Sequence, residues 1–319
     1  MPTDVTTLDE IRGAGRVIAG RLHRTPLVRS TALGRQTDTR LFLKAEVLQK
    51  TGSFKPRGVL NKLSALTADE KRRGLITISA GNHGQAVAYA AAEEGLTCVV
   101  VMPAYASPAK VAACRGYGAE VIVDGDVHQA FAKVRELQTA RGLTLVHPYD
   151  DRDVIAGQGT IGLEILEDLP DVAAVVVPIG GGGLISGIAA AIKLSRPATR
   201  VIGVEPQGAP TLRLALDRGA PVRLDSVDTI ADGLTGPIAG ALTLQAVQRF
   251  VDDVLLVSDE DIAGAVRLIL ERTKLLAEPA GAAATAALLS GRLSLPSGTT
   301  VVAVLSGGNV DRARLKALL

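Results

Sequence analysis

The feature that most constrains the fold is a repeated alternation between short apolar runs and longer alanine-rich stretches. Many of the runs are rich in valine and isoleucine, as expected of parallel strands covered on both faces. They lie at residues 75–79, 98–102, 120–123, 143–146, 173–177, 201–204, 254–257 and 300–305. Helical stretches such as residues 82–94, 127–140 and 259–274 lie between them. This alternation predicts an α/β protein with parallel sheets.

The length of the chain and its lack of a linker indicate how the domains are organised. A chain of 319 residues suggests about two domains. No proline- and serine-rich stretch separates them, so we expect short crossings and one lobe inserted into the other. The N-terminal segment is expected to open with a helix, because Thr7 and Glu10 have the spacing of a capping box.

The composition excludes several classes of protein. Hydrophobic residues make up 47% of the chain and the net charge is +2, so the chain is not disordered. The balanced charge and the 3% of aromatic residues argue against nucleic-acid binding, which needs clustered cations or stacking rings. Cys98 and Cys114 fit no zinc spacing and are expected to be buried thiols in the core.

One uncharged stretch has two possible interpretations, a membrane-spanning helix or a buried strand followed by a helix. Residues 172–192 are long enough to cross a bilayer. Pro178 and Gly180–Gly183 interrupt the stretch, however, and would break a spanning helix. We therefore expect a strand, a turn and a helix there. The N-terminus shows no secretory signal, and a cytoplasmic enzyme without a membrane partner is expected.

Glycine gathers in four turns that follow apolar runs. These turns are SAGNHGQ at 79–85, PIGGGGLISG at 178–187, ADGLTG at 231–236 and LSGGNVD at 305–311. A glycine-rich turn between a strand and a helix lets backbone amides approach a phosphate. Gly180–Gly183 is the best candidate, with a flexible linker as the alternative. Neither common nucleotide-binding glycine pattern fits, so a smaller phosphorylated ligand is expected.

Lys55 lies in the turn-forming stretch TGSFKPRG rather than on a charged helix face. The flanking Phe54 and Pro56 would desolvate its amine, lower its pKa and make it a nucleophile toward carbonyl groups. An ordinary solvated surface lysine is the alternative. A Schiff-base lysine together with a phosphate site favours pyridoxal phosphate as cofactor.

Eight motifs in register resemble the threonine dehydratase/serine racemase family of fold type II pyridoxal-phosphate enzymes. They are KTGSFKPRG, SAGNHGQ, IAGQGTIGLEI, PIGGGGLISG, GVEP, IADGL, AEPAGA and LSGGN, and together they cover nearly the whole chain. The resemblance implies two lobes, each with a mainly parallel twisted sheet flanked by helices, and a cofactor between them. The large lobe would be 1–74 with 147–319, and the small inserted lobe 75–146.

The resemblance also implies a role for individual residues. Lys55 matches the catalytic lysine that holds pyridoxal 5'-phosphate as a Schiff base. Cofactor contacts are implied for Phe54, Asn82, Gly180, Gly181, Gly182, Gly183, Gly233, Glu278 and Ser306. Substrate-carboxylate contacts are implied for Ser79, Ala80, Gly81, Asn82 and His83. The alternatives are a strand-end hydroxyl for Ser306, helix caps for Ser79 and Asn82, a helix-start carboxylate for Glu278, and a buried structural imidazole for His83.

The activity that the resemblance implies is β-elimination from L-threonine, L-serine or both, giving a 2-keto acid and ammonia. In serine racemases a serine stands where this chain has Ala80, so racemisation is expected to be weak or absent. A dehydratase for 3-hydroxyaspartate or 3-phenylserine and a serine racemase are the enzymatic alternatives. A cofactor- or metabolite-binding module is the non-enzymatic one.

Several further expectations rest on the same resemblance. The family's divalent-cation site is matched by Glu205 and the Ala209 carbonyl, but Thr211 stands in place of a carboxylate ligand. We therefore expect a monovalent ion, or none, rather than Mg²⁺. A homodimer or homotetramer is expected. The chain stops at Leu319, so no C-terminal regulatory domain and no feedback control through one are expected.

Overall fold

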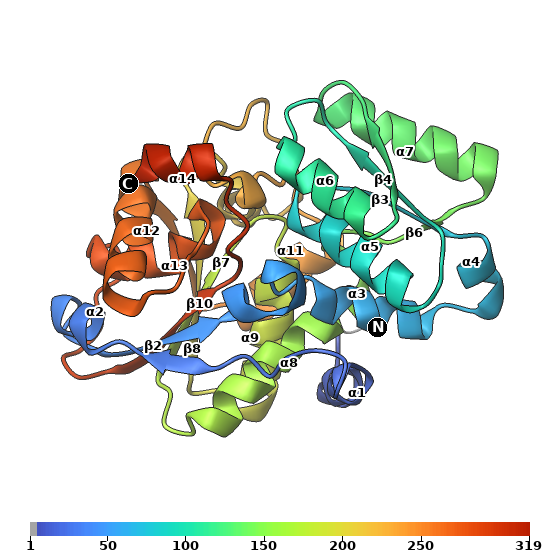
Figure 1. The fold of residues 1–319 in the computed structure, drawn as a ribbon. Helices are drawn as coiled ribbons and strands as arrows, with labels where there is room; N and C mark the ends of the chain where they lie inside the picture. Colours follow the sequence, from blue (N-terminus) through green and yellow to red (C-terminus); the bar gives the residue numbers. More distant parts are fainter. Residues whose placement is uncertain (1–4) are drawn as a thin grey trace.

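The structure, a computed structural model, describes residues 5–319 and contains two β-sheets covered by helices (Figure 1). The six-stranded sheet has the order β1 (Leu27–Arg29), β2 (Arg40–Ala45), β10 (Thr300–Leu305), β7 (Ala174–Pro178), β8 (Arg200–Pro206) and β9 (Asp253–Val257). The four-stranded sheet has the order β5 (Glu120–Val123), β4 (Cys98–Met102), β3 (Leu75–Ile78) and β6 (Thr144–Leu145).

Helices connect nearly all of these strands. They are α1 (Leu8–Ile18), α2 (Thr31–Gln36), α3 (Pro56–Ala65), α4 (Ala68–Arg72), α5 (Asn82–Glu93), α6 (Pro108–Gly116), α7 (Val127–Arg141), α8 (Arg152–Asp168), α9 (Gly183–Ser195), α10 (Thr211–Arg218), α11 (Ala241–Phe250), α12 (Asp259–Thr273), α13 (Pro279–Leu289) and α14 (Arg312–Leu318). Short 3-10 helices are η1 (Glu46–Leu48), η2 (Lys50–Gly52) and η3 (Asp232–Leu234). As the sequence predicts, a capping box of Thr7 and Glu10 begins α1.

The strand pairing confirms the predicted α/β class with mainly parallel sheets. Every pair in the four-stranded sheet is parallel, and so is every pair from β2 to β9 in the six-stranded sheet. The exception is β1, which pairs antiparallel with β2. The sequence did not predict β1, because three residues carry too little of an apolar pattern.

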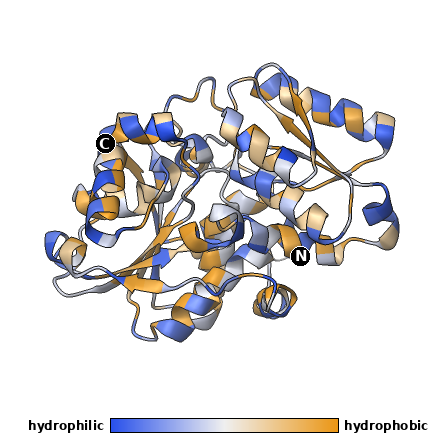
Figure 2. Cartoon of the chain, in the orientation of Figure 1, coloured by the Kyte–Doolittle hydropathy of each residue, from blue (hydrophilic) through white to orange (hydrophobic). Residues whose placement is uncertain are grey.

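Both faces of the six-stranded sheet are buried, because β7 sends alternate side chains to opposite cores. Val175 and Val177 pack with α8, α9 and α11 on one face. Ala174 and Val176 pack with α12 and α13 on the other. Figure 2 shows strands that are mostly orange inside helices that carry both colours. This two-sided burial is why the strands read as unbroken apolar runs.

The four-stranded sheet is built in the same way. Helices α5 and α6 cover one face, and α7 covers the other. Helix α3 packs against both α5 and α8, so it lies between the two halves of the molecule. Cys98 and Cys114 are buried, as predicted.

The segment that carries the smaller sheet begins and ends on neighbouring strands. β3 and β6 are parallel partners, and the amide of Thr144 donates to the carbonyl of Gly74 at 2.9 Å. The predicted boundaries of an inserted lobe at 75–146 stay a prediction, and the first four residues of the predicted large lobe lie outside the described residues.

Residues 172–192 form β7, a glycine turn and α9, as the interrupted apolar pattern predicts. Nowhere in residues 5–319 does a helix reach the length and apolarity needed to cross a membrane.

Candidate active site

A cavity lies where the carboxyl ends of strands from both sheets meet. Its lining includes Ser79 to His83 after β3, Gly180 to Gly183 after β7, and Ser306 after β10. Ligands of α/β proteins bind at such edges. Residues 232–236 also line the cavity, which therefore brings together all four glycine-rich turns singled out in the sequence.

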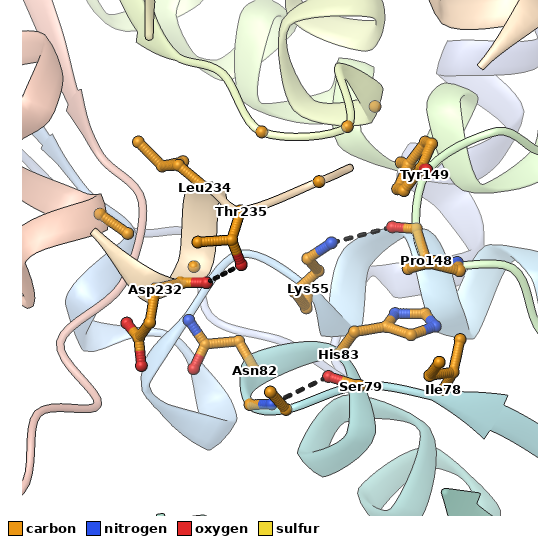
Figure 3. A pocket seen from close by; sticks show the side chains of 18 of the residues that line it. Lys55, Ile78, Ser79, Asn82, His83, Pro148, Tyr149, Asp232, Leu234 and Thr235 are labelled. Carbon is orange, nitrogen blue, oxygen red and sulfur yellow. Dashed lines mark hydrogen bonds between the residues drawn. The ribbon is translucent and has the colours of Figure 1, made fainter. Parts of the chain in front are cut away.

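Lys55 reaches into the middle of this cavity (Figure 3). It precedes the first turn of α3, and Pro56 at the start of that helix has no amide hydrogen to satisfy. The Lys55 Nζ donates a hydrogen bond to the Pro148 carbonyl at 2.8 Å and lies 5.1 Å from the centre of the Phe54 ring. Burial lowers the pKa of Lys55 to about 8. A minor but appreciable fraction of this amine is thus neutral, and nucleophilic, near physiological pH.

A buried ion cluster lies two residues beyond Lys55. The Arg57 guanidinium donates to both oxygens of Glu46 at 2.8 Å and to Glu164 at 2.6 and 3.0 Å. Lys44 donates to Glu164 at 2.6 Å. Two cations and two carboxylates therefore balance in this cluster, and they join β2, η1, α3 and α8. The bonds hold the start of α3, and with it Lys55, against the six-stranded sheet.

The glycine turn between β7 and α9 packs tightly against its neighbours. A Cβ atom on Gly181 would come within 2.2 Å of the Tyr149 ring, and one on Gly180 within 3.0 Å of Leu234. Gly182 has a φ of +90° and turns the chain into α9. The first amides of α9 have no acceptor within the helix, and this end of α9 lines the cavity. The arrangement is suited to an anion.

Asn82 and Glu278 meet in another part of the cavity lining. The Asn82 Nδ2 donates to Glu278 Oε1, while Asn82 Oδ1 accepts from Asn309 at 2.8 Å. Glu278 is the N-cap residue of α13, the helix-start position of its alternative, although its side chain makes no cap hydrogen bond. Its Oε2 is buried without a partner among the described residues. Burial raises the pKa of Glu278 to about 7, and the nearby charge of Lys110 opposes that effect.

The remaining predicted cofactor contacts line the same cavity. Ser306 follows β10 and is buried, and its carbonyl accepts the amide of Phe54 at 3.1 Å. Gly233 lies in η3, where a Cβ would come within 2.8 Å of the Ala280 Cβ. Lys55, Phe54, Asn82, Gly180–Gly183, Gly233, Glu278 and Ser306 thus all line one cavity.

The turn after β3 supplies the predicted substrate contacts. The Gly81 amide donates to Ser79 Oγ at 3.0 Å, and Asn82 is the first residue of α5 rather than its cap. His83 is buried with its Nε2 3.0 Å from the Val146 carbonyl, and its Nδ1 has no partner in the described part of the chain. Burial, and then the nearby Lys55 amine, lower the pKa of His83 well below its usual value. His83 is therefore neutral and holds no charge for a carboxylate.

The structure adds cavity residues that the sequence did not predict. The Lys110 Nζ, from α6 beside the smaller sheet, donates to Asp232 Oδ2 at 2.7 Å, and Asp232 begins η3 in the larger part of the chain. The Tyr149 hydroxyl donates to the Ile238 carbonyl at 2.9 Å. Asp232 lies in a glycine turn that the sequence singled out, but Lys110 sits in no motif, and its partner is 122 residues away.

The candidate cation residues are occupied by backbone partners. The Glu205 carboxylate accepts the amides of Leu212 at 2.7 Å and Arg213 at 2.8 Å, in the first turn of α10. The Ala209 carbonyl accepts the Thr211 amide at 3.0 Å. Burial raises the pKa of Glu205 to about 7. Residues 5–319 contain no group of three or more metal-binding side chains, and the choice of cation stays a prediction.

The cavity fits pyridoxal phosphate in its donors and acceptors. The glycine turn suits the phosphate, Lys55 supplies an amine of lowered pKa, and the apolar ring of Phe54 lies beside it. The buried and unpartnered Glu278 Oε2 marks a polar wall that still lacks a hydrogen bond.

Comparisons with known proteins agree with this chemistry. A family model described as "Pyridoxal-phosphate dependent enzyme" matches residues 18–307. L-threonine ammonia-lyase of Thermotoga maritima is 45% identical over 306 residues, covering 96% of this chain and 76% of that protein. The catabolic L-threonine dehydratase of Escherichia coli is 45% identical over 313 residues, covering 98% of this chain and 95% of that protein. Maize serine racemase has a TM-score of 0.94 and 38% identity, covering 98% and 96% of the two chains. With a family match over most of its length, around a cavity built for this cofactor, the chain belongs to the pyridoxal-phosphate dependent enzymes.

Proposed function

We propose that the protein is a pyridoxal-phosphate-dependent ammonia-lyase that converts L-threonine, L-serine or both into a 2-keto acid and ammonia. The observation that carries this proposal is the position of Lys55. Its amine, with a pKa of about 8, lies in one cavity with an anion-binding glycine turn and the Ser79–His83 turn. A basic amine, a phosphate site and a site for a substrate carboxylate are the parts that such an elimination needs.

Several groups that line the cavity receive a role in this proposal. The amides of Gly180–Gly183 and the start of α9, which line the cavity, would hold the phosphate of the cofactor, and Lys55 Nζ would attach its aldehyde group. Asn82, with Gly233 and Glu278, would orient its ring, and Ser306 would supply the side chain for the ring nitrogen. When bound, pyridoxal phosphate supplies an electron sink for the charge left at the substrate Cα.

Lys55 Nζ is also the base that we assign to the Cα proton. Burial keeps the amine substantially neutral near pH 8, so Nζ can accept a proton. The Ser79–His83 turn orients the substrate carboxylate through backbone amides and the Ser79 and Asn82 side chains. Ser306 carries no negative charge to hold a proton on the ring nitrogen, and this favours prompt loss of the β-hydroxyl group.

Ala80 favours elimination over racemisation. Racemisation needs a second proton donor on the opposite face of Cα, and the methyl group of Ala80 has no exchangeable proton. The similar proteins include an ammonia-lyase and a serine racemase, so similarity alone does not choose between the two activities. The Ala80 side chain is why a lyase is proposed here and a serine racemase is the second candidate.

The direct test is a keto-acid and ammonia assay on protein loaded with pyridoxal phosphate. We expect both products from L-threonine or L-serine, and D-serine formation from L-serine slower than pyruvate formation. Lys55→Ala should lower kcat by at least about 10³-fold, because one atom both binds the cofactor and moves the proton. Lys316→Ala removes an exposed lysine of α14 and should leave kcat unchanged.

Two results would contradict the proposal. Full keto-acid production by Lys55→Ala would remove Lys55 from its role. Absence of the visible absorbance of a lysine-bound cofactor, even after pyridoxal phosphate is added, would favour the binding-module alternative. A cytoplasmic location, a homodimer or homotetramer, and a monovalent cation or none stay predictions.

A further inference from the structure

One wall of the cavity has no part in the contacts proposed for the cofactor or the substrate carboxylate. It is formed by the first turns of α7, where Val127 and Phe131 line the cavity. The two residues are four positions apart, so their side chains lie on the same face of the helix. We refer to Val127 and Phe131 as the α7 wall. Both side chains are partly exposed and line the cavity.

The α7 wall adjoins the turn proposed to hold the substrate carboxylate. Phe131 packs against the buried cluster that contains Ile78 and Val101 of the smaller sheet. Ile78 lines the cavity and directly precedes Ser79. A substrate with its amine at Lys55 and its carboxylate at the Ser79–His83 turn directs its β-carbon to a third wall. The α7 wall is apolar and lies beside that turn, because Phe131 packs against the cluster that contains Ile78.

No unpaired cation faces the cavity from this side. Among the described residues that line the cavity, the charged side chains are Lys55, Lys110, Asp232 and Glu278. The Lys110 Nζ lies 2.7 Å from Asp232 Oδ2, so its charge is already compensated. A carboxylate on the substrate's β-carbon would lose its hydration without gaining a partner, which is costly.

We propose that the α7 wall determines substrate specificity by accepting β-hydroxy amino acids with a small apolar or absent β-substituent and rejecting those with an acidic one. This inference rests on the proposed function and deepens it. Threonine places a methyl group on the wall, and burying one methyl group predicts a roughly tenfold preference over serine in kcat/KM. 3-Hydroxyaspartate places a carboxylate there and is excluded.

The deciding experiment measures binding, so it does not depend on elimination. Protein loaded with pyridoxal phosphate is titrated by calorimetry with L-2-aminobutyrate and with L-aspartate, which have equal backbones and no β-hydroxyl group. The unmutated protein should bind L-2-aminobutyrate more tightly. Phe131→Arg places a cation on the α7 wall and should shift the ratio of the two Kd values toward L-aspartate by roughly 100-fold.

Matched variants separate the wall from a general charge effect. Ala132→Arg adds the same charge one residue along, on the exposed side of α7, and should leave the ratio unchanged. Phe131→Leu keeps the wall apolar and should retain the preference for L-2-aminobutyrate. Val127→Arg places the cation one turn earlier on the same face and should repeat the shift, which covers a failure of Phe131→Arg to fold.

The outcomes distinguish the specificity wall from the lyase activity. Tighter binding of L-aspartate by the unmutated protein, or an equal shift from Ala132→Arg, would overturn the α7 wall. An unchanged ratio in both Phe131→Arg and Val127→Arg would do the same. The predicted binding shifts without keto acid from any substrate would support the wall and reject the lyase activity.

Discussion

Glu278 brings a carboxylate into the cavity with only one of its two oxygens hydrogen-bonded. Burial raises its pKa to about 7 from an ordinary value of 4.5. The folded protein therefore holds a proton on Glu278 at pH values where the unfolded chain has lost it. This proton stabilises the folded state fully below about pH 4.5, and the stabilisation is lost as the pH rises through about 7.

Glu278→Gln should stabilise the cofactor-free protein relative to the unmutated protein, and this stabilisation should be larger at pH 8 than at pH 5. Glutamine keeps an oxygen for Asn82 and carries no charge to bury. The gain at pH 8 should reach up to about 3 kcal/mol in the free energy of unfolding, and it should fall below about 1 kcal/mol at pH 5. Thermal unfolding at the two pH values measures it.

An exposed carboxylate provides the control for this titration. Glu271→Gln on α12 should show no difference between pH 5 and pH 8. If Glu278→Gln behaves in the same way, Glu278 is ionised in the folded protein at both pH values, and the polar wall is charged rather than neutral.

The sequence predicts single residues well where local chemistry distinguishes them. Lys55 stands out because a proline and an aromatic ring flank it within a turn, and the pKa of the amine is indeed lowered. Lys110 could not be found in this way. Its neighbours along α6 resemble an ordinary helix surface, and only the fold brings Asp232 to it. Phe131 reads as a core residue of a helix and becomes a cavity residue only through the packing of α7.

At the scale of single elements, the turn between β7 and α9 depends on its glycines. Gly182 adopts a φ of +90°, and a Cβ there would come within 2.8 Å of Leu212 Cδ1 and 2.9 Å of Thr243 Cβ. Any other residue must shift the turn or strain the backbone. Because α9 begins at Gly183, a shifted turn also moves the amides that we assign to the phosphate.

Gly182→Ala should weaken binding of pyridoxal phosphate by at least roughly tenfold and destabilise the fold by about 1–3 kcal/mol. Absorbance titration of the cofactor-free protein measures the Kd, and thermal unfolding measures the stability. Gly264→Ala is the matched control, because a Cβ there has no atom within 4 Å and helix α12 gains an alanine. A lower stability with an unchanged Kd would make the turn structural and not a phosphate site.

The strands could be predicted to within about two residues wherever an apolar run marks them. The fully buried strands Cys98–Met102 and Thr300–Leu305 coincide with such runs, and so does the partly exposed edge strand Glu120–Val123. β6 is shorter than its run because only two residues pair with β3. β1 gives no apolar signal, since it lies at the edge of its sheet with only partial burial.

At the scale of the whole molecule, the cluster around Arg57 joins distant parts of the chain. Arg57 is fully buried, and Arg57→Met would leave Glu46 and Glu164 with Lys44 as their only cation in the cluster. Breaking a buried pair in this way typically costs about 3–5 kcal/mol. Urea unfolding should show a loss of that size.

The double variant Arg57→Met with Glu46→Leu should recover much of the loss, because Lys44 and Glu164 then balance. Arg57→Lys should lie between the two, since a lysine cannot bond both carboxylates in parallel. A loss below about 1 kcal/mol for Arg57→Met would show that the cluster contributes little to stability.

The order of strands in the two sheets lies beyond what the sequence predicts. An apolar run predicts that a strand is buried, but it does not predict the neighbours of that strand. The last strand, β10, lies between β2 and β7. That placement brings Ser306 and Phe54 together from opposite ends of the chain, where the amide of Phe54 meets the carbonyl of Ser306. The resemblance supplied the two-lobed arrangement as an expectation, and the sheets have the parallel pairing it implies.

The adjacency of Gly74 and Thr144 has a practical consequence for protein engineering. The segment that carries the smaller sheet begins after Gly74 and reaches its last strand at Thr144, and one hydrogen bond joins these two residues. Both the Ser79–His83 turn and Phe131 lie inside that excursion, whereas Lys55 and the Gly180–Gly183 turn lie outside it. A transplant that exchanges this one continuous segment between relatives would need only two neighbouring splice points. The donor would bring its own substrate preference, and the recipient would keep its reactive chemistry.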